Sequence, residues 1–166
     1  MSRDASFWVG LAHARLGSGA LITDSEGRVL MVEPTYKPTW EIPGGAVESG
    51  ETSLETCRRE CREELGIDIR VGRLLVIDHQ TDPLPRGDSV MFVYDGGTLD
   101  STAELVLPED ELRSSRFVAL EELDALTTER LARRVRFALE ARAKNAVIEL
   151  ANGAPRDWSE ISSSET

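Results

Sequence analysis

Three glutamates lie close together in a segment that has the composition of a helix. Glu60, Glu63 and Glu64 stand at positions i, i+3 and i+4, a spacing that places side chains on neighbouring arcs of one helix face. Like charges at this spacing repel, each pair costing roughly 0.2 to 0.5 kcal/mol of helix stability. Closely spaced carboxylates are ligands for a hard divalent cation such as Mg²⁺ or Mn²⁺. The trio is therefore either a metal site or an acidic surface paired with neighbouring arginines.

A longer pattern surrounds the glutamates. Five residues separate Gly45 from Glu51, seven more lead to Arg59, and the run then reads RECREELGI as far as Ile67. Seven fixed identities at fixed offsets would coincide by chance at roughly 10⁻⁸ to 10⁻⁹ per starting position. These 23 residues resemble the Nudix box, and the WEIPG stretch at 40–44 also resembles that family. One departure is Cys61, where the family usually has an aliphatic residue; a thiol packs similarly.

The resemblance implies a role for each of several residues. Glu60 and Glu64 are the first expected metal ligands, with Glu63 as a third carboxylate at the rim. The Gly45 carbonyl and Glu111 are the further ligands expected from the family. Arg59 and Glu51 are expected to pair and to hold the loop on the helix, in support of catalysis. The general base is either Glu63 or a carboxylate outside the box; Glu111 is the best such candidate, and Glu109 and Asp110 compete with it.

The activity implied by the resemblance is metal-dependent hydrolysis of a diphosphate bond in a nucleoside diphosphate linked to another moiety. Pro83 lies sixteen residues beyond Ile67, a spacing that resembles the subgroup acting on ADP-ribose, so an ADP-ribose or nucleotide-sugar substrate is favoured. Trp40, Gly44 and Pro83 are the expected substrate-binding residues. The aromatic residues Tyr36, Phe92 and Tyr94 offer either base stacking or core packing.

Two alternative functions stay open. One is a pyrophosphohydrolase that removes oxidised or non-canonical nucleoside triphosphates from the nucleotide pool. The other is a non-catalytic Nudix-like nucleotide sensor, which would have no need for the metal-binding carboxylates present in this sequence.

Composition narrows the class of partner. With 166 residues the chain has room for one domain, and its 40% apolar and 30% charged content is typical of a soluble globular protein. A net charge of -11 disfavours a nucleic acid polymer as partner. The sequence has no run of eighteen apolar residues, so we expect no membrane-spanning helix. The first residues lack the long apolar region and the cleavage site of a signal peptide. We therefore expect a cytoplasmic protein that acts on small nucleotides, with Cys57 and Cys61 as buried thiols rather than a disulfide.

The order of predicted strands and helices indicates an α+β sandwich, with helices on the faces of a mixed sheet. The resemblance implies the same arrangement, a Nudix-like α/β/α sandwich with a mixed sheet and flanking helices. Strands are expected at 19–23, 28–33, 67–77, 89–94 and 116–120, and helices at 52–65, 121–126 and 128–150. The first two strands form a hairpin, and Gly66 ends the first helix.

The ends of the chain complete these expectations. A single domain should cover 1–151, followed by a flexible tail at 152–166. Four arginines of the last helix are expected to form a solvated face, with a phosphate or partner site as the alternative: Arg130, Arg133, Arg134 and Arg136. A homodimer is an open alternative, in which residues 7–9 and the last helix cover a second subunit instead of completing the core.

Overall fold

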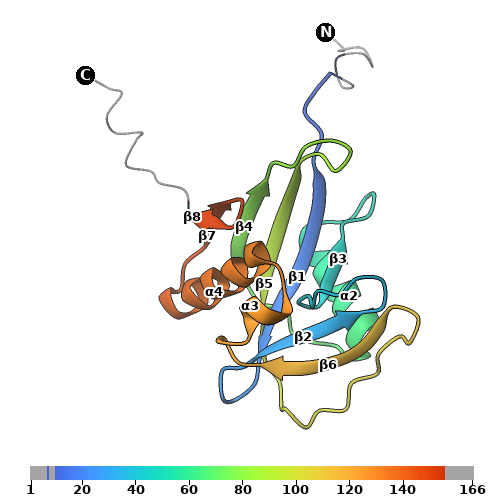
Figure 1. Cartoon of the computed structure of the whole chain (residues 1–166), viewed down its shortest axis with the longest axis vertical. Helices are drawn as coiled ribbons and strands as arrows, with labels where there is room; N and C mark the ends of the chain where they lie inside the picture. The colour runs from blue at the N-terminus through green and yellow to red at the C-terminus, as the bar shows by residue number, and fades with distance from the viewer. Residues whose placement is uncertain (1–6, 8–9, 156–166) are drawn as a thin grey trace.

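Within the residues that the computed structural model describes, Phe7 and 10–155, eight strands form one mixed sheet (Figure 1). The strands are β1 (Arg15–Thr23), β2 (Val29–Pro34), β3 (Gly44–Ala46), β4 (Leu74–Gln80), β5 (Ser89–Thr98), β6 (Leu112–Val118), β7 (Ile148–Ala151) and β8 (Ala154–Pro155). Their spatial order is β6-β2-β1-β5-β4-β7-β8, with β3 paired to β1. The β1–β5 and β4–β7 pairs are parallel and the remaining pairs are antiparallel.

The sheet separates two helical layers, which confirms the predicted sandwich. Alternate residues of a strand face opposite sides of a sheet. Leu21 of β1 joins the cluster packed against α4 (Glu129–Lys144), whereas Ala20 and Ile22 join the cluster packed against α2 (Ser53–Leu65). A short helix, α3 (Leu123–Leu126), connects β6 to α4.

The first helix begins and ends where the sequence predicts. Thr52 accepts a hydrogen bond from the backbone N–H of Glu55, whose side chain accepts one from the Thr52 backbone in return. This capping box satisfies donors that the first turn leaves unpaired. Gly66 adopts a left-handed φ of 67° and ends the helix. Cys57, Cys61 and Leu65 are fully buried against the sheet, so both cysteines are free, buried thiols as expected.

The predicted helix at 128–150 is too long. It ends at Lys144 because Asn145 adopts a left-handed conformation with φ 52°, and the chain then returns as β7, which lies parallel to β4. The sequence 146–150 is apolar enough to continue a helix, and only its pairing with β4 makes it a strand.

Other boundaries also differ from the prediction. The strand expected at 67–77 begins only at Leu74, because the preceding Ile67 and Ile69 pack against the cluster around α2 in irregular backbone. The hairpin of β1 and β2 is confirmed. The strand expected at 116–120 corresponds to β6, which lies at one edge of the sheet. Two further strands that were not predicted, β7 and β8, come later in the chain. Of the predicted tail, residues 152–155 form a turn and β8, while 156–166 lie outside the described residues.

Candidate functional site

The backbone of Gly44 and Gly45 lies against the side chains of α2. Both glycines belong to β3, which pairs with Gly19 and Ser18 of β1. A Cβ added to Gly45 would come within 2.3 Å of Glu60 Oε1. The Gly44 N–H donates a hydrogen bond of 2.8 Å to Glu64 Oε2. Two glutamates one helical turn apart therefore meet the same short strand, and only glycine leaves room for the first of them.

Arg59 holds three carboxylates around one guanidinium group. Its Nε donates to Glu51 Oε1 at 2.8 Å, and its Nη1 donates to Glu60 Oε1 at 2.8 Å and to Glu63 Oε2 at 3.0 Å. The predicted pair of Glu51 and Arg59 is thus present. Hydrogen bonds from Arg59 and then from Thr56 lower the pKa of Glu51 to about 2.

Glu64 is the most enclosed carboxylate of this group. Only 8% of its surface is exposed. Burial is the largest cause that raises its pKa, to about 8, and the nearby charges of Glu60, Glu111 and Glu41 add to the shift against the Gly44 hydrogen bond. Burial likewise raises the pKa of Glu60, although Arg59 opposes it. Negative charge is therefore crowded at this point of the molecule.

The expected ligands outside this pair lie at the rim. The side chain of Glu63 is 57% exposed and turns toward Arg59. Glu111 directly precedes β6, is exposed, and interacts electrostatically with both Glu60 and Glu64. Within the described part of the chain, no three acidic, histidine or cysteine side chains are arranged around one point as metal ligands. Of the three glutamates expected to bind the ion, Glu60 and Glu63 accept hydrogen bonds from Arg59, and Glu64 accepts one from the Gly44 N–H.

The two competing acids next to Glu111 are also exposed. Glu109 and Asp110 lie in the turn that leads into β6, and the backbone carbonyl of Asp110 accepts a hydrogen bond from Thr35. The charge of Glu111 raises the pKa of both Glu60 and Glu64. This electrostatic interaction favours Glu111 as the outside carboxylate.

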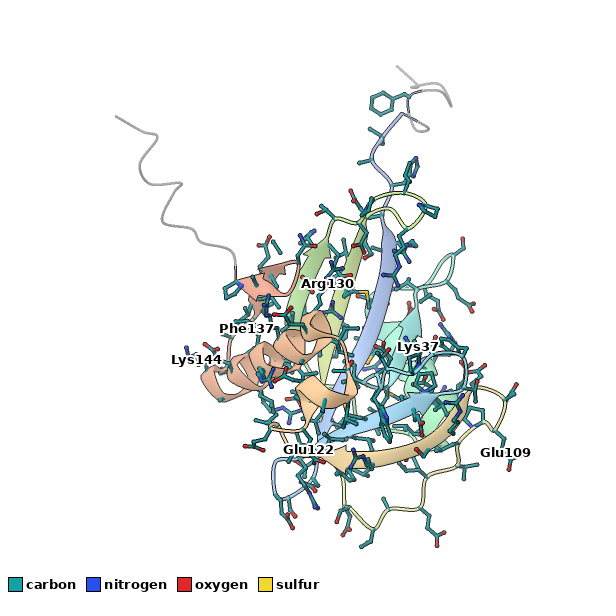
Figure 2. All side chains as sticks on the ribbon, in the orientation of Figure 1. Lys37, Glu109, Glu122, Arg130, Phe137 and Lys144 are labelled. Carbon is teal, nitrogen blue, oxygen red and sulfur yellow. The ribbon has the colours of Figure 1, made fainter. Side chains whose placement is uncertain are left out.

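A cleft of about 1220 Å³ opens beside these residues. Its floor includes Gly17 and Gly19 of β1, and Met91 of β5, on the α4 side of the sheet. Gly44, Gly45 and Glu64 contribute to one wall. Residues at the start of α4 contribute to the other, and Figure 2 shows Arg130 there, across β1 from Lys37 in this view. Glu60 is not among the lining residues, because it lies behind Gly45.

The expected substrate-binding residues occupy different places. Gly44 lines the cleft. Trp40 does not: its ring packs against the core beneath α4, with the Arg116 guanidinium 5.2 Å from the ring centroid. Pro83 is exposed in the loop between β4 and β5, outside the cleft lining, although Asp82 contributes to it. Tyr36, by contrast, lines the cleft and is 76% exposed.

Most of the arginines on α4 make specific ion pairs instead of a uniform solvated face. Arg134 is buried and donates two hydrogen bonds to Asp78, of 2.9 and 2.8 Å. Arg130 pairs with Asp82, across a separation of 48 residues. These partners lie on or just after β4, far from α4 in the sequence. Local sequence patterns therefore could not predict the two ion pairs. Both arginines line the cleft.

Among Phe7 and residues 10–155, no helix has the length and apolar content needed to cross a bilayer.

Comparison with known proteins gives consistent results. A family model described as NUDIX domain matches residues 13–139. An 8-oxo-dGDP phosphatase, NUDT18, of Danio rerio is 38% identical over 91 residues, which cover 52% of this chain and 27% of that protein. An ADP-ribose pyrophosphatase of Methanocaldococcus jannaschii is 31% identical over 112 residues, 63% of this chain and 62% of the relative. The chain thus spans less than two thirds of the length of either protein.

The fold has matches among solved structures. A MutT NUDIX hydrolase from Burkholderia pseudomallei superimposes with a TM-score of 0.63 at 28% sequence identity, covering 78% of this chain and 98% of that one.

Proposed function

The chain belongs to the Nudix family, and on that basis we propose that it hydrolyses a diphosphate bond in a nucleoside diphosphate linked to another moiety, with the help of a divalent cation. The observation that carries this proposal is the position of Glu60 and Glu64. One lies behind Gly45 and the other beside Gly44, at the wall of a cleft large enough for a nucleotide.

The donor set fits a hard divalent cation. Glu64 is enclosed and stands near the charges of Glu60, Glu111 and Glu41, an arrangement that raises its pKa to about 8. Oxygen ligands of this kind suit Mg²⁺ or Mn²⁺. Glu60, Glu64 and the Gly45 carbonyl would hold the ion, with Glu63 and Glu111 at its edge. When bound, the ion would offset the charge of the substrate phosphates, polarise a phosphoryl oxygen and lower the pKa of a coordinated water.

The protein groups have distinct tasks in this reaction. Arg59 fixes Glu51 and thereby the loop that follows Gly45. The Gly44 N–H holds the Glu64 carboxylate in place. Glu63 and Glu111 are both exposed and carry oxygens that can accept a proton from the attacking water. Tyr36 presents an exposed ring at the cleft for stacking against a base or sugar.

ADP-ribose or a nucleotide sugar is the favoured substrate type. The similarity to an archaeal ADP-ribose pyrophosphatase supports this choice. The similarity to a zebrafish 8-oxo-dGDP phosphatase favours a second candidate, an enzyme that clears oxidised nucleotides. The net charge of -11 favours a small nucleotide over a nucleic acid polymer in both cases. A non-catalytic sensor is less well supported, because every glutamate of the box is present.

A substrate panel tests the proposal. Hydrolysis of ADP-ribose, nucleotide sugars, dinucleoside polyphosphates and oxidised deoxynucleotides is followed with Mg²⁺ and with Mn²⁺, and products are separated as nucleoside monophosphate, phosphate or pyrophosphate. Metal-dependent release of a nucleoside monophosphate from ADP-ribose is expected. Turnover restricted to oxidised nucleotides would favour the second candidate. Nucleotide binding without turnover, unchanged in Glu64→Gln, would indicate the sensor.

A further inference from the structure

The two walls of the cleft carry opposite charge. Glu64 and Glu41 contribute to the wall formed by the segments around β3. The opposite wall, formed by the β4–β5 loop and the start of α4, contains Arg86, Arg130 and Arg134. The proposed reaction uses residues of the acidic wall, and it assigns no role to the arginines of the basic wall.

Three arginines act electrostatically on a single carboxylate of the basic wall, Asp82. A hydrogen bond from Arg130 is the largest cause that lowers the pKa of Asp82, and the charges of Arg130, Arg86 and Arg15 lower it further. Arg15 and Arg86 are exposed, and both line the cleft. Glu129 also stands on this wall, but it pairs with Arg133. One carboxylate cannot balance three guanidinium groups, so the wall around Asp82 has positive charge to offer.

The side-chain contacts of Arg130 are longer than those of Arg134 on the same helix. Its four hydrogen bonds, to Asp82 and Gln80, measure 3.2 or 3.3 Å. Bonds between a guanidinium and a carboxylate are usually about 2.7 to 2.9 Å. Arg134, one turn further along the helix, meets that range with Asp78. Arg134 is thus a neutralised anchor, whereas Arg130 has weak contacts that a better acceptor can replace.

The start of α4 adds to this tendency. Arg130 is the second residue of a 16-residue helix whose first turn, together with Thr128, lines the cleft. The N-terminus of a helix carries partial positive charge and favours anions. The loose arginine and the helix terminus therefore act in the same direction.

We propose that this wall, through Arg130 with Arg86 and Arg15, binds an additional anionic group on the substrate, a phosphate or carboxylate carried beyond the diphosphate that is cleaved. The inference rests on the proposed function, since it names which nucleoside diphosphate derivatives the same cleft prefers. An anion displaces Asp82 as the partner of Arg130, and charge-assisted bidentate contacts make the charged substrate the better one.

Matched substrate pairs test this inference. UDP-glucuronate and UDP-glucose differ by a carboxylate, and ADP-ribose 2′-phosphate and ADP-ribose differ by a phosphate. The ratio of kcat/KM within each pair is measured for the wild type, Arg130→Gln, Arg86→Gln and Asp82→Asn. Arg136→Gln, on the same helix but paired with Asp124 outside the cleft lining, is the control for loss of one positive charge.

We expect the wild type to favour the charged member of at least one pair by about tenfold. The pair that responds identifies the anion as carboxylate or phosphate. The preference should fall toward one in Arg130→Gln, weaken in Arg86→Gln, rise in Asp82→Asn and stay unchanged in Arg136→Gln. Equal rates for both members of both pairs in the wild type would overturn the inference while leaving the hydrolase intact, as would a preference that Arg130→Gln retains.

Calorimetric binding of the same four nucleotides without metal separates this inference from the proposed function. A wild type that turns over none of the panel contradicts the proposed hydrolase. Tighter binding of a charged member, lost in Arg130→Gln, would still support the anion site in that case. Equal binding of charged and uncharged members would overturn it.

Discussion

The carboxylate of Glu60 lies so close to the Cα of Gly45 that a methyl group on Gly45 would come within 2.3 Å of Glu60 Oε1. In the same strand, β3, the Gly44 N–H donates a hydrogen bond to the Glu64 carboxylate. The position of the Glu60 carboxylate therefore depends on the absence of a side chain at Gly45.

Gly45→Ala tests this dependence. The added methyl group must push Glu60 or the loop away, and a displacement of about 1 Å at reacting groups can reduce a rate by about 100-fold. We expect a loss of turnover of this order with a small change in melting temperature. Steady-state kinetics and thermal unfolding measure the two effects. Ala46→Ser, at the next and exposed position, is the control and should keep its activity.

Glu64→Gln should separate catalysis from folding. The amide can still accept the Gly44 hydrogen bond but carries no charge for a cation, so turnover should fall by at least about 100-fold while the fold is retained. Circular dichroism checks the fold. Glu63→Gln, at the exposed rim, should lose less unless Glu63 is the general base, which a change in the pH–rate profile would reveal. Normal turnover in Glu64→Gln would contradict the assigned metal site.

Binding of a cation should release protons. Burial and neighbouring charges raise the pKa of Glu64 to about 8, so the group is mostly protonated at pH 7 before an ion binds. Titration with Mg²⁺ or Mn²⁺ in buffers of different ionisation enthalpy should show release of close to one proton per ion at pH 7 and almost none at pH 9.5. Glu64→Gln should abolish the difference between buffers. Cation binding at pH 7 without proton release would show that Glu64 is already ionised.

The pairing of Glu51 with Arg59 should make the loop sensitive to acid. Because Arg59 and Thr56 lower the pKa of Glu51 to about 2 from an ordinary 4.5, the contribution of Glu51 to stability is complete above about pH 4.5 and is lost as the pH falls toward 2. Urea unfolding at several pH values should show wild type and Glu51→Gln converging in that window. Glu48→Gln, exposed in the same loop, should follow the wild type.

The buried pair of Asp78 and Arg134 should support the fold more than the exposed pairs do. Asp78 is fully buried and also accepts a hydrogen bond from the Gly153 N–H. Asp78→Ala leaves Arg134 as a buried, unpaired charge, which costs about 3 to 5 kcal/mol. Asp68→Ala removes the exposed partner of Arg62 and should cost less than about 1 kcal/mol. Chemical denaturation of both variants measures the contrast.

The parts of the structure that local sequence signals specify were predictable. The helix from Ser53 to Leu65 is bounded by Thr52, which caps its start, and by Gly66, which ends it. Both signals are local and can be recognised in the sequence. The pair of Glu51 and Arg59 lies eight residues apart and follows from the motif. The order of strands and helices along the chain predicted a mixed sheet with helices on its faces, and the family resemblance implied the same arrangement.

What the sequence could not reveal depends on contacts between distant segments. β7 becomes a strand by pairing with β4, about 70 residues earlier in the chain; Asn145, whose type tolerates the left-handed conformation, was the available sign that the helix stops. The pairing of Arg130 and Arg134 with acids at β4 likewise requires the folded sheet. Trp40 is partly buried and packs against the core cluster that lies between the sheet and α4.

The glycine floor of the cleft limits how this protein can be re-engineered. At Gly17 and Gly19 the backbone itself forms the base of the cleft, and a Cβ would come within 2.5 Å of Met91 Cε at the first and 2.8 Å of the Pro43 carbonyl at the second. Nothing smaller can be installed there, so truncation at these two sites cannot deepen the cavity for bulkier compounds. Libraries aimed at altered substrate selectivity should instead vary the two walls of the cleft. There the charge and length of the side chains can be changed by substitution.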